Sequence, residues 1–237
     1  MQTTGTVVLS KRMTAVANMV SPGSITADIG CDHGFVSIYL IEQHVCSKVI
    51  AMDINDGPLK RAKEHIAQRN LSKYIEIRQS DGAKALNYCE DAEKHLEVDS
   101  MIAAGIGGRL MIKIMEDSME KILSMKEIIL QPQSEIAKVR HFLIKHGFSI
   151  VNEDMVFDEG KYYQIIKAIP YTKEKRALTL YEEWYGPILI KEKNKVLCQY
   201  LLSEKEKYEG ILSHIEKNKD SVTERLQLIT TTLGFIL

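Results

Sequence analysis

Residues 25–34 read Ile25-Thr26-Ala27-Asp28-Ile29-Gly30-Cys31-Asp32-His33-Gly34, an apolar run that opens into a turn framed by two glycines. A second apolar run, Val49-Ile50-Ala51-Met52, ends in Asp53. The pattern predicts a strand, a glycine turn, a helix, a second strand and an acid. In a βαβ unit of this size the turn and the acid meet at one edge of a parallel sheet, where nucleotide-like ligands bind.

The residues of the turn indicate the kind of ligand. A dinucleotide-binding turn offers a pyrophosphate bare backbone, whereas three side chains separate Gly30 from Gly34 here. Asp28 and Asp32 would repel a diphosphate and attract a cation. S-adenosylmethionine carries a sulfonium and an ammonium beside its adenosine, whose ribose hydroxyls Asp53 can bind. The spacing therefore predicts an S-adenosylmethionine site; the alternative is an ordinary strand-to-helix turn with solvated acids.

A further segment extends the expected cofactor site. Ser80-Asp81-Gly82 follows the third predicted strand, where Asp81 and the backbone of Gly82 can contact the adenine, although such a sequence is also a common turn. The residues expected to bind the cofactor are Asp28, Gly30, Cys31, His33, Gly34, Asp53, Ile54, Asp81, Gly82 and Gly105.

Composition limits the class of protein. The chain has 237 residues, 45% of them hydrophobic, enough for one α/β core and a smaller appendage. Its formal net charge of -1 predicts no global attraction to polyanions, so a nucleic-acid surface would have to be local. The four cysteines are scattered and the histidines form no metal-binding motif, so we expect no metal. Without a basic leader or a long apolar run, we expect a cytoplasmic protein that is not bound to a membrane.

The first 170 residues alternate between strand and helix patterns. Strands are predicted at 24–29, 48–53, 74–78, 98–104, 127–130, 148–157 and 162–169, with amphipathic helices between most of them, including 58–70 and 134–146. This alternation predicts a doubly wound α/β sheet over residues 1–170. Only Asp158-Glu159-Gly160-Lys161 joins the last two strands, so we expect an antiparallel hairpin at one end of the sheet.

Residues 171–237 have a different pattern and are predicted to form a helical, coiled-coil-like domain. Residues 171–185 are predicted helical, with a break at Gly186-Pro187. A seven-residue repeat then follows, at Asn194, Leu201, Tyr208, Ile215, Val222 and Ile229, which is apolar apart from Asn194 and has an irregularity near Asn218. An imperfect repeat favours antiparallel packing of two or three helices, and we favour a monomer. Trp184 is predicted to anchor this domain; the alternative is stacking on RNA.

The basic residues have two interpretations. Lysines of the helical domain, at 191, 193, 195, 205, 207, 217 and 219, form either a solvated face or a clamp for RNA phosphates. Seven others could rim the pocket mouth or serve only solubility: Lys11, Arg12, Arg109, Lys138, Arg140, Lys145 and Lys161.

The fourth predicted strand runs into Gly105-Ile106-Gly107-Gly108-Arg109, where an acceptor would meet the methyl group. Enzymes that methylate exocyclic amines place an Asn or Asp, two prolines and an aromatic residue at this point, and that motif is missing. A glycine-rich loop suits an acceptor that needs little activation. The alternative is a loop that merely starts the following helix.

Five segments together resemble the bacterial tRNA (adenine-22, N1)-methyltransferases. They are residues 9–12, 28–34, 104–110, 130–134 (Leu130-Gln131-Pro132-Gln133-Ser134) and 160–163. The resemblance covers nearly the whole chain and implies a class I methyltransferase with a Rossmann-like domain and a C-terminal helical domain. It also implies S-adenosylmethionine as the cofactor and N1 of adenine 22 in tRNA as the acceptor.

This chemistry needs positioning more than a base, because N1 of an unpaired adenine has a free lone pair at neutral pH. Positive charge develops on the base, and Asp32 is the candidate catalytic residue that stabilises it; the alternative is that Asp32 binds only the cofactor's ammonium. Arg12, Arg109, Gln133 and Tyr163 are candidates to orient the base or a phosphate, or else have structural roles. Two other functions stay open: methylation of a small molecule or protein, and noncatalytic RNA binding by a relic cofactor fold.

Overall fold

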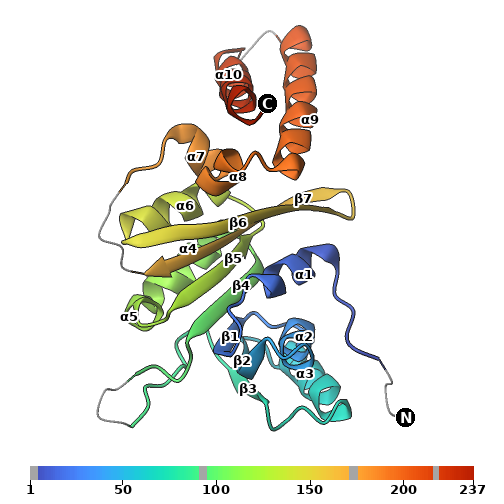
Figure 1. Ribbon diagram of the computed structural model, residues 1–237, viewed down its shortest axis with the longest axis vertical. Coiled ribbons are helices and arrows are strands. Elements are labelled where there is room, and N and C mark those ends of the chain that lie inside the picture. Colours follow the sequence, from blue (N-terminus) through green and yellow to red (C-terminus); the bar gives the residue numbers. More distant parts are fainter. Residues whose placement is uncertain (1–4, 91–94, 171–175, 216–218) are drawn as a thin grey trace.

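A computed structural model describes residues 5–90, 95–170, 176–215 and 219–237. Its centre is one seven-stranded sheet with helices on both faces, and a helical part stands at one end (Figure 1). The strands are β1 Ser24–Ile29, β2 Cys46–Asp53, β3 Ile75–Gln79, β4 Ser100–Ile106, β5 Glu127–Pro132, β6 Phe148–Asp158 and β7 Lys161–Pro170. The helices are α1 Lys11–Asn18, α2 Phe35–Glu42, α3 Asp56–Gln68, α4 Gly108–Asp117, α5 Met119–Leu123, α6 Ile136–Lys145, α7 Leu180–Tyr185, α8 Pro187–Lys191, α9 Lys195–His214 and α10 Lys219–Ile236.

The strand order is β3-β2-β1-β4-β5-β7-β6. Strands β1 to β5 pair in parallel, while β7 runs antiparallel to both β5 and β6. The predicted doubly wound sheet and its terminal hairpin are therefore confirmed. The chain reverses its direction of winding between β1 and β4, so the crevice at the carboxyl ends of these two strands is the expected ligand site.

Alternate side chains of each strand supply two separate cores. Ala27 and Ile29 of β1 pack with Met111 and Phe142 of α4 and α6 on one face. On the opposite face, α1, α2 and α3 cover other side chains of the sheet, including Val49 and Ala51 of β2. The central parallel strands β1, β2, β4 and β5 are thus largely buried on both sides, and they are mostly apolar for that reason.

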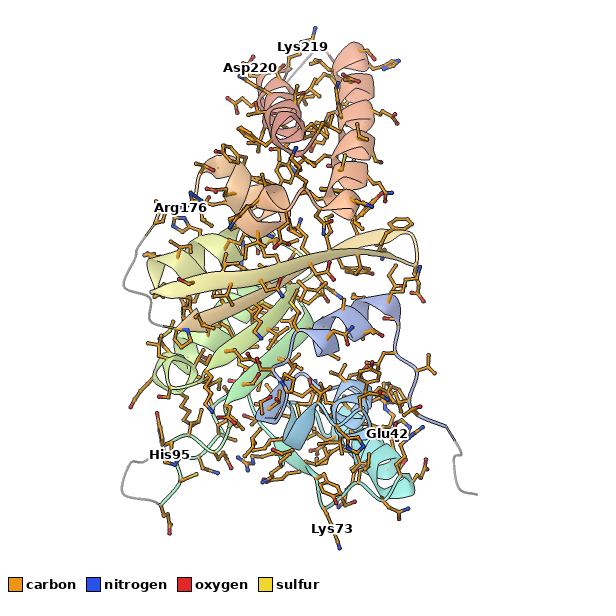
Figure 2. The ribbon with its side chains drawn as sticks, viewed as in Figure 1. Glu42, Lys73, His95, Arg176, Lys219 and Asp220 are labelled. Atoms are coloured by element: carbon orange, nitrogen blue, oxygen red, sulfur yellow. The ribbon has the colours of Figure 1, made fainter. Side chains whose placement is uncertain are left out.

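The C-terminal helices pack as an antiparallel pair. Leu197 and Leu201, near the start of α9, share one apolar cluster with Ile229 and Leu233, near the end of α10. Figure 2 shows Lys219, at the start of α10, at the end of the pair farthest from the sheet. The predicted antiparallel packing is confirmed, whereas a coiled-coil geometry and the domain division at residue 170 stay predictions.

Two details of the helical prediction were wrong. Residues 176–179 are not helical, because Thr179 caps α7: its backbone N–H and its hydroxyl both donate to Glu182 Oε2 at 2.9 Å. Asn194 is not part of an apolar seam, since its Oδ1 caps α9 by accepting from the backbone N–H groups of Val196 and Leu197. Residues 171–175, Lys217 and the predicted irregularity at Asn218 lie outside the described residues.

A buried ion pair joins the helical part to the sheet. Arg140 of α6 donates from Nε to Glu153 of β6 at 2.7 Å, and both side chains are fully buried. Arg140 also donates to the last carbonyls of α7, while Glu153 accepts from the backbone N–H of Ile188 at 2.8 Å, in the first turn of α8. Gly186 connects α7 to α8 at φ +93°, and a Cβ there would lie 2.6 Å from a Glu153 oxygen. The expectation that Arg140 rims the pocket mouth was therefore wrong.

Within the described ranges, the helices are all too short or too polar to cross a lipid bilayer.

Candidate functional site

The turn after β1 folds back onto the end of β2. The backbone N–H groups of Gly30 and Cys31 both donate to the carbonyl of Met52, at 2.8 and 2.9 Å. Gly34 then starts α2 at φ +75°, where an added Cβ would lie 3.1 Å from the Cβ of Ala62 on α3. A side chain at position 34 would be strained and crowded, so glycine is needed for α2 to start against α3.

Three carboxylates surround this turn. Asp28 is buried at the end of β1 and accepts a hydrogen bond from the Ser37 hydroxyl at 2.6 Å. Burial raises the pKa of Asp28 to about 6, against the effect of Ser37, and the nearby charge of Asp53 adds to the rise. The pKa of the Cys31 thiol is also raised, first by burial and then by Asp28, Asp53 and Asp32. The three carboxylates therefore make the surroundings of this turn negative, which favours a cation.

Asp32 and His33 lie on the outer side of the turn. The Asp32 side chain is 69% exposed and its oxygen lies 3.5 Å from His33 Nε2. His33 stacks on Phe35, which in turn stacks on His65 of α3 with ring centroids 4.8 Å apart. Asp32 has a left-handed backbone with φ +50°, and its exposed carboxylate is within reach of an incoming group.

Asp53 closes β2 beside the turn. Its Oδ1 accepts from the backbone N–H of Asn55 at 2.9 Å, and the neighbouring Ile54 side chain is largely exposed. The backbone N–H of Ser80 donates to the carbonyl of Asp53, so the segment after β3 starts beside it. Gly82 is buried, but Asp81 points outward and pairs with Lys84 at 2.5 Å. The Asp81 carboxylate is thus held by a lysine, which competes with its expected contact to adenine.

The second half of the site lies where β4 and β5 end. Gly105, near the end of β4, has a left-handed backbone with φ +74°. A Cβ there would lie 3.4 Å from Arg12 Nη1 and 3.7 Å from Gln133 Nε2. The Arg12 guanidinium lies over the Tyr163 ring, 5.0 Å from its centroid. Four of the expected residues, from α1, β4, β7 and the end of β5, therefore meet at one place.

Arg109 stands apart from this group. Its side chain is 86% exposed on the first turn of α4, 3.5 Å from Glu135. The first N–H of that helix, from Gly108, donates to the Ser134 hydroxyl at 3.3 Å. A Cβ on Gly108 would lie 2.3 Å from the Ser134 carbonyl, so the glycine loop serves the close packing of α4 against the start of α6.

Three further residues complete the site and were not among the candidates. Ser37 holds Asp28, Asp158 accepts from the backbone N–H of Arg12 at 3.0 Å, and the buried Gln131 bonds both Arg12 and Gly105. Gln131 lies within a segment that the sequence singles out, and its polarity inside a buried strand was the available signal. The described residues contain no group of three His, Cys, Asp or Glu side chains suited to a metal ion.

Comparison with known proteins defines the class of this chain. Residues 9–166 match a family model described as "Methyltransferase domain". Together with the strand order and the acid-lined turn, this match makes the chain a methyltransferase with a Rossmann-like fold.

More closely related proteins define the family. The chain is 30% identical to the tRNA (adenine(22)-N(1))-methyltransferase of Bacillus subtilis over 93% of this chain and 91% of that protein. A structure of Streptococcus pneumoniae Sp1610 in complex with S-adenosyl-L-methionine covers 95% of this chain and 100% of its own, with 30% identity and a TM-score of 0.83. The structure of the M1A22 tRNA methyltransferase TrmK of B. subtilis covers 96% and 99%, with 28% identity and a TM-score of 0.81. The chain belongs to the family of tRNA (adenine(22)-N(1))-methyltransferases.

Proposed function

We propose that this protein transfers the methyl group of S-adenosylmethionine to N1 of adenine 22 in tRNA. The observation that carries the proposal is the meeting of two half-sites at the switch point between β1 and β4. One half is the acid-lined turn of Asp28, Asp32 and Asp53. The other is the glycine loop with Arg12 and Tyr163. The B. subtilis relative carries the name of this activity, and the related S. pneumoniae protein was solved with this cofactor.

The residues of the turn fit the cofactor. Gly30 has φ +73°, which suits glycine and lets the chain turn sharply at the end of β1, and the carboxylates complement a sulfonium and an ammonium. Asp53 has one oxygen bonded by Asn55 and the other available for the ribose hydroxyls. Bound there, S-adenosylmethionine would supply an electrophilic methyl group.

The chain's own residues would contribute positioning and charge stabilisation. N1 of adenine attacks with its lone pair, so no base has to remove a proton first. N1 normally faces its Watson–Crick partner, so the base must be unpaired or flipped out to reach the glycine loop. The exposed carboxylate of Asp32 is our candidate to stabilise the positive charge that develops on the base.

The proposal includes tRNA contacts from both parts of the chain and a cytoplasmic location, where tRNA substrates occur. Arg12, Gln133 and Tyr163 would contact the acceptor nucleotide. Arg109, at the exposed start of α4, would contact RNA farther from the reacting base.

Replacing one ring atom of the target adenine tests whether N1 is the atom that accepts the methyl group. A tRNA with 1-deazaadenosine at position 22 keeps the shape and amine of the base but has carbon in place of N1. We expect it to bind and to accept no methyl group, whereas 7-deazaadenosine, which retains N1, should react. Radiolabelled methyl transfer measures both, and methylation of the 1-deaza substrate would refute N1 as the acceptor.

A further inference from the structure

Gln131 connects two elements of the acceptor half-site through a single oxygen. Its side chain is fully buried at the end of β5. Its Oε1 accepts from Arg12 Nη1 at 2.8 Å and from the backbone N–H of Gly105 at 3.1 Å, while its Nε2 donates to the Pro132 carbonyl at 3.3 Å. Because Gln131 is buried and bonded on both sides of its amide, its position is fixed, and it fixes its partners in turn.

Arg12 is restrained on every side that the structure describes. Gln131 holds one end of the guanidinium, the Tyr163 ring lies beneath it, and Asp158 bonds its backbone N–H. Among the described residues no carboxylate pairs with this guanidinium, whereas those of Arg69, Arg78 and Arg140 each pair with glutamate. A neutral amide positions Arg12 without cancelling its charge, and the remaining N–H groups stay available to a ligand.

The charge of Arg12 indicates what it binds. Positive charge develops on adenine during methyl transfer, so a fixed guanidinium beside N1 would oppose the reaction. A backbone phosphate next to the target nucleotide is instead the complementary group, and guanidinium binds phosphate through paired N–H groups. We propose that Gln131 is a positioning residue: it holds the Arg12 side chain in place without neutralising its positive charge, so that the guanidinium can bind a phosphate of the acceptor nucleotide. The proposal rests on the proposed function, because it takes tRNA as the substrate.

Two substitutions of Gln131 separate the loss of its accepting oxygen from the gain of a negative charge beside Arg12. Gln131→Glu keeps the accepting oxygen but adds a negative charge that would pair with Arg12. Gln131→Met removes the acceptor. Arg12→Ala removes the cation, and Gln68→Glu on the exposed face of α3 is the control for a charge change alone.

The readout is the salt dependence of tRNA binding, measured by filter binding, together with the affinity for S-adenosylmethionine. Arg12→Ala and Gln131→Glu should each weaken tRNA binding about tenfold and reduce the slope of log K against log salt by about one. Gln131→Glu combined with Arg12→Ala should add no further change in slope, because both act on one contact. Cofactor affinity should be unchanged in Arg12→Ala and Gln131→Glu, which both keep an acceptor for the Gly105 N–H, and Gln68→Glu should leave the slope at the wild-type value.

Several results would overturn the proposal. An unchanged slope in Gln131→Glu, or additive losses in the double variant, would mean that Gln131 does not act through Arg12. If the Gln131 variants fail to fold, Arg12→Ala decides alone, because Arg12 is only partly buried and belongs to no apolar core cluster; an unchanged slope there contradicts a phosphate contact. Binding is measured apart from turnover, so a wild-type protein that binds tRNA without methylating it refutes the proposed function and leaves the slope test intact.

Discussion

The three carboxylates around the turn after β1 differ in burial, and they are suited to different roles for that reason. Asp28 is buried and bonded to Ser37, Asp53 is half-buried with one bonded oxygen, and Asp32 faces outward. A buried acid tunes the charge of the pocket, whereas an exposed acid can meet an incoming group.

Removal of the Asp53 carboxylate should weaken cofactor binding. Asp53→Ala is expected to cost about 1–3 kcal/mol of binding free energy, since the ribose hydroxyls would lose a charged partner. Titration calorimetry with S-adenosylmethionine measures the loss, and Asp56→Ala, an exposed acid three residues later, is the matched control. Equal affinities for wild type and Asp53→Ala would exclude a ribose contact.

Asp28 should make stability depend on pH. Its pKa of about 6 in the fold lies above the ordinary value near 3.9, so the folded state favours the protonated acid. The stability that this group contributes is complete below pH ~4 and is lost as the pH rises through about 6. Asp28→Asn lacks that loss, so its stability relative to wild type should increase by roughly 2–3 kcal/mol between pH 4 and 7. Urea unfolding of the cofactor-free proteins across this range measures it; parallel curves would contradict a raised pKa.

At the scale of elements, the hairpin of β6 and β7 connects the site to the helical part. On one side Tyr163 supports Arg12, and on the other Tyr162 packs against Tyr200 of α9 with centroids 5.1 Å apart. The Arg140–Glu153 pair lies at the same junction and bonds the end of α7 and the start of α8. The helical part is therefore attached by buried polar bonds as well as by apolar packing.

Breaking this buried pair should cost far more than breaking an exposed one. Arg140→Met is expected to destabilise the protein by about 3–5 kcal/mol, because it leaves the Glu153 charge buried and unpaired. Lys207→Met removes the exposed partner of Glu204 and should cost less than about 1 kcal/mol. Chemical denaturation compares the two, and similar losses would contradict a structural role for the junction.

The same elements illustrate what the sequence could and could not reveal. Apolar runs and glycines located every strand, and the four-residue connection at 158–161 predicted the hairpin. Gln131 and Arg140 were missed as site and junction residues, because the partners that give them these roles, Arg12 and the Glu183 carbonyl, lie 119 and 43 residues away along the chain. Helix α7 was predicted too long, since it begins only after its N-cap Thr179 and no glycine or proline marks that start.

At the scale of the whole molecule, three exposed lysines of the helical part are candidates to extend the tRNA contact. Lys191, Lys193 and Lys195, at the foot of α9, are exposed, and the described residues provide no ion pair for them. Trp184 stacks under Arg225 of α10 at 3.8 Å and so anchors this part, as expected from the sequence. We infer that the foot of the helical part lies along the RNA.

Neutralising these three lysines to glutamine should weaken tRNA binding and reduce its salt slope by up to about three, with cofactor affinity unchanged. The control is the same charge change at Lys60, Lys63 and Lys73, at the other end of the molecule, where Figure 2 labels Lys73. Filter binding at several salt concentrations measures both sets. Equal losses in the two triple variants would indicate a nonspecific attraction and would contradict a contact at the foot of α9.

The identity of the methylated nucleoside is the most direct test of the account. Unmodified tRNA is incubated with the protein and S-adenosylmethionine, digested under mild neutral conditions that suppress rearrangement of the N1 product, and analysed by mass spectrometry. The account predicts 1-methyladenosine at position 22, and its absence from tRNA in which that adenosine is replaced by guanosine. N6-methyladenosine as the initial product, or no methylated adenosine at all, would contradict it.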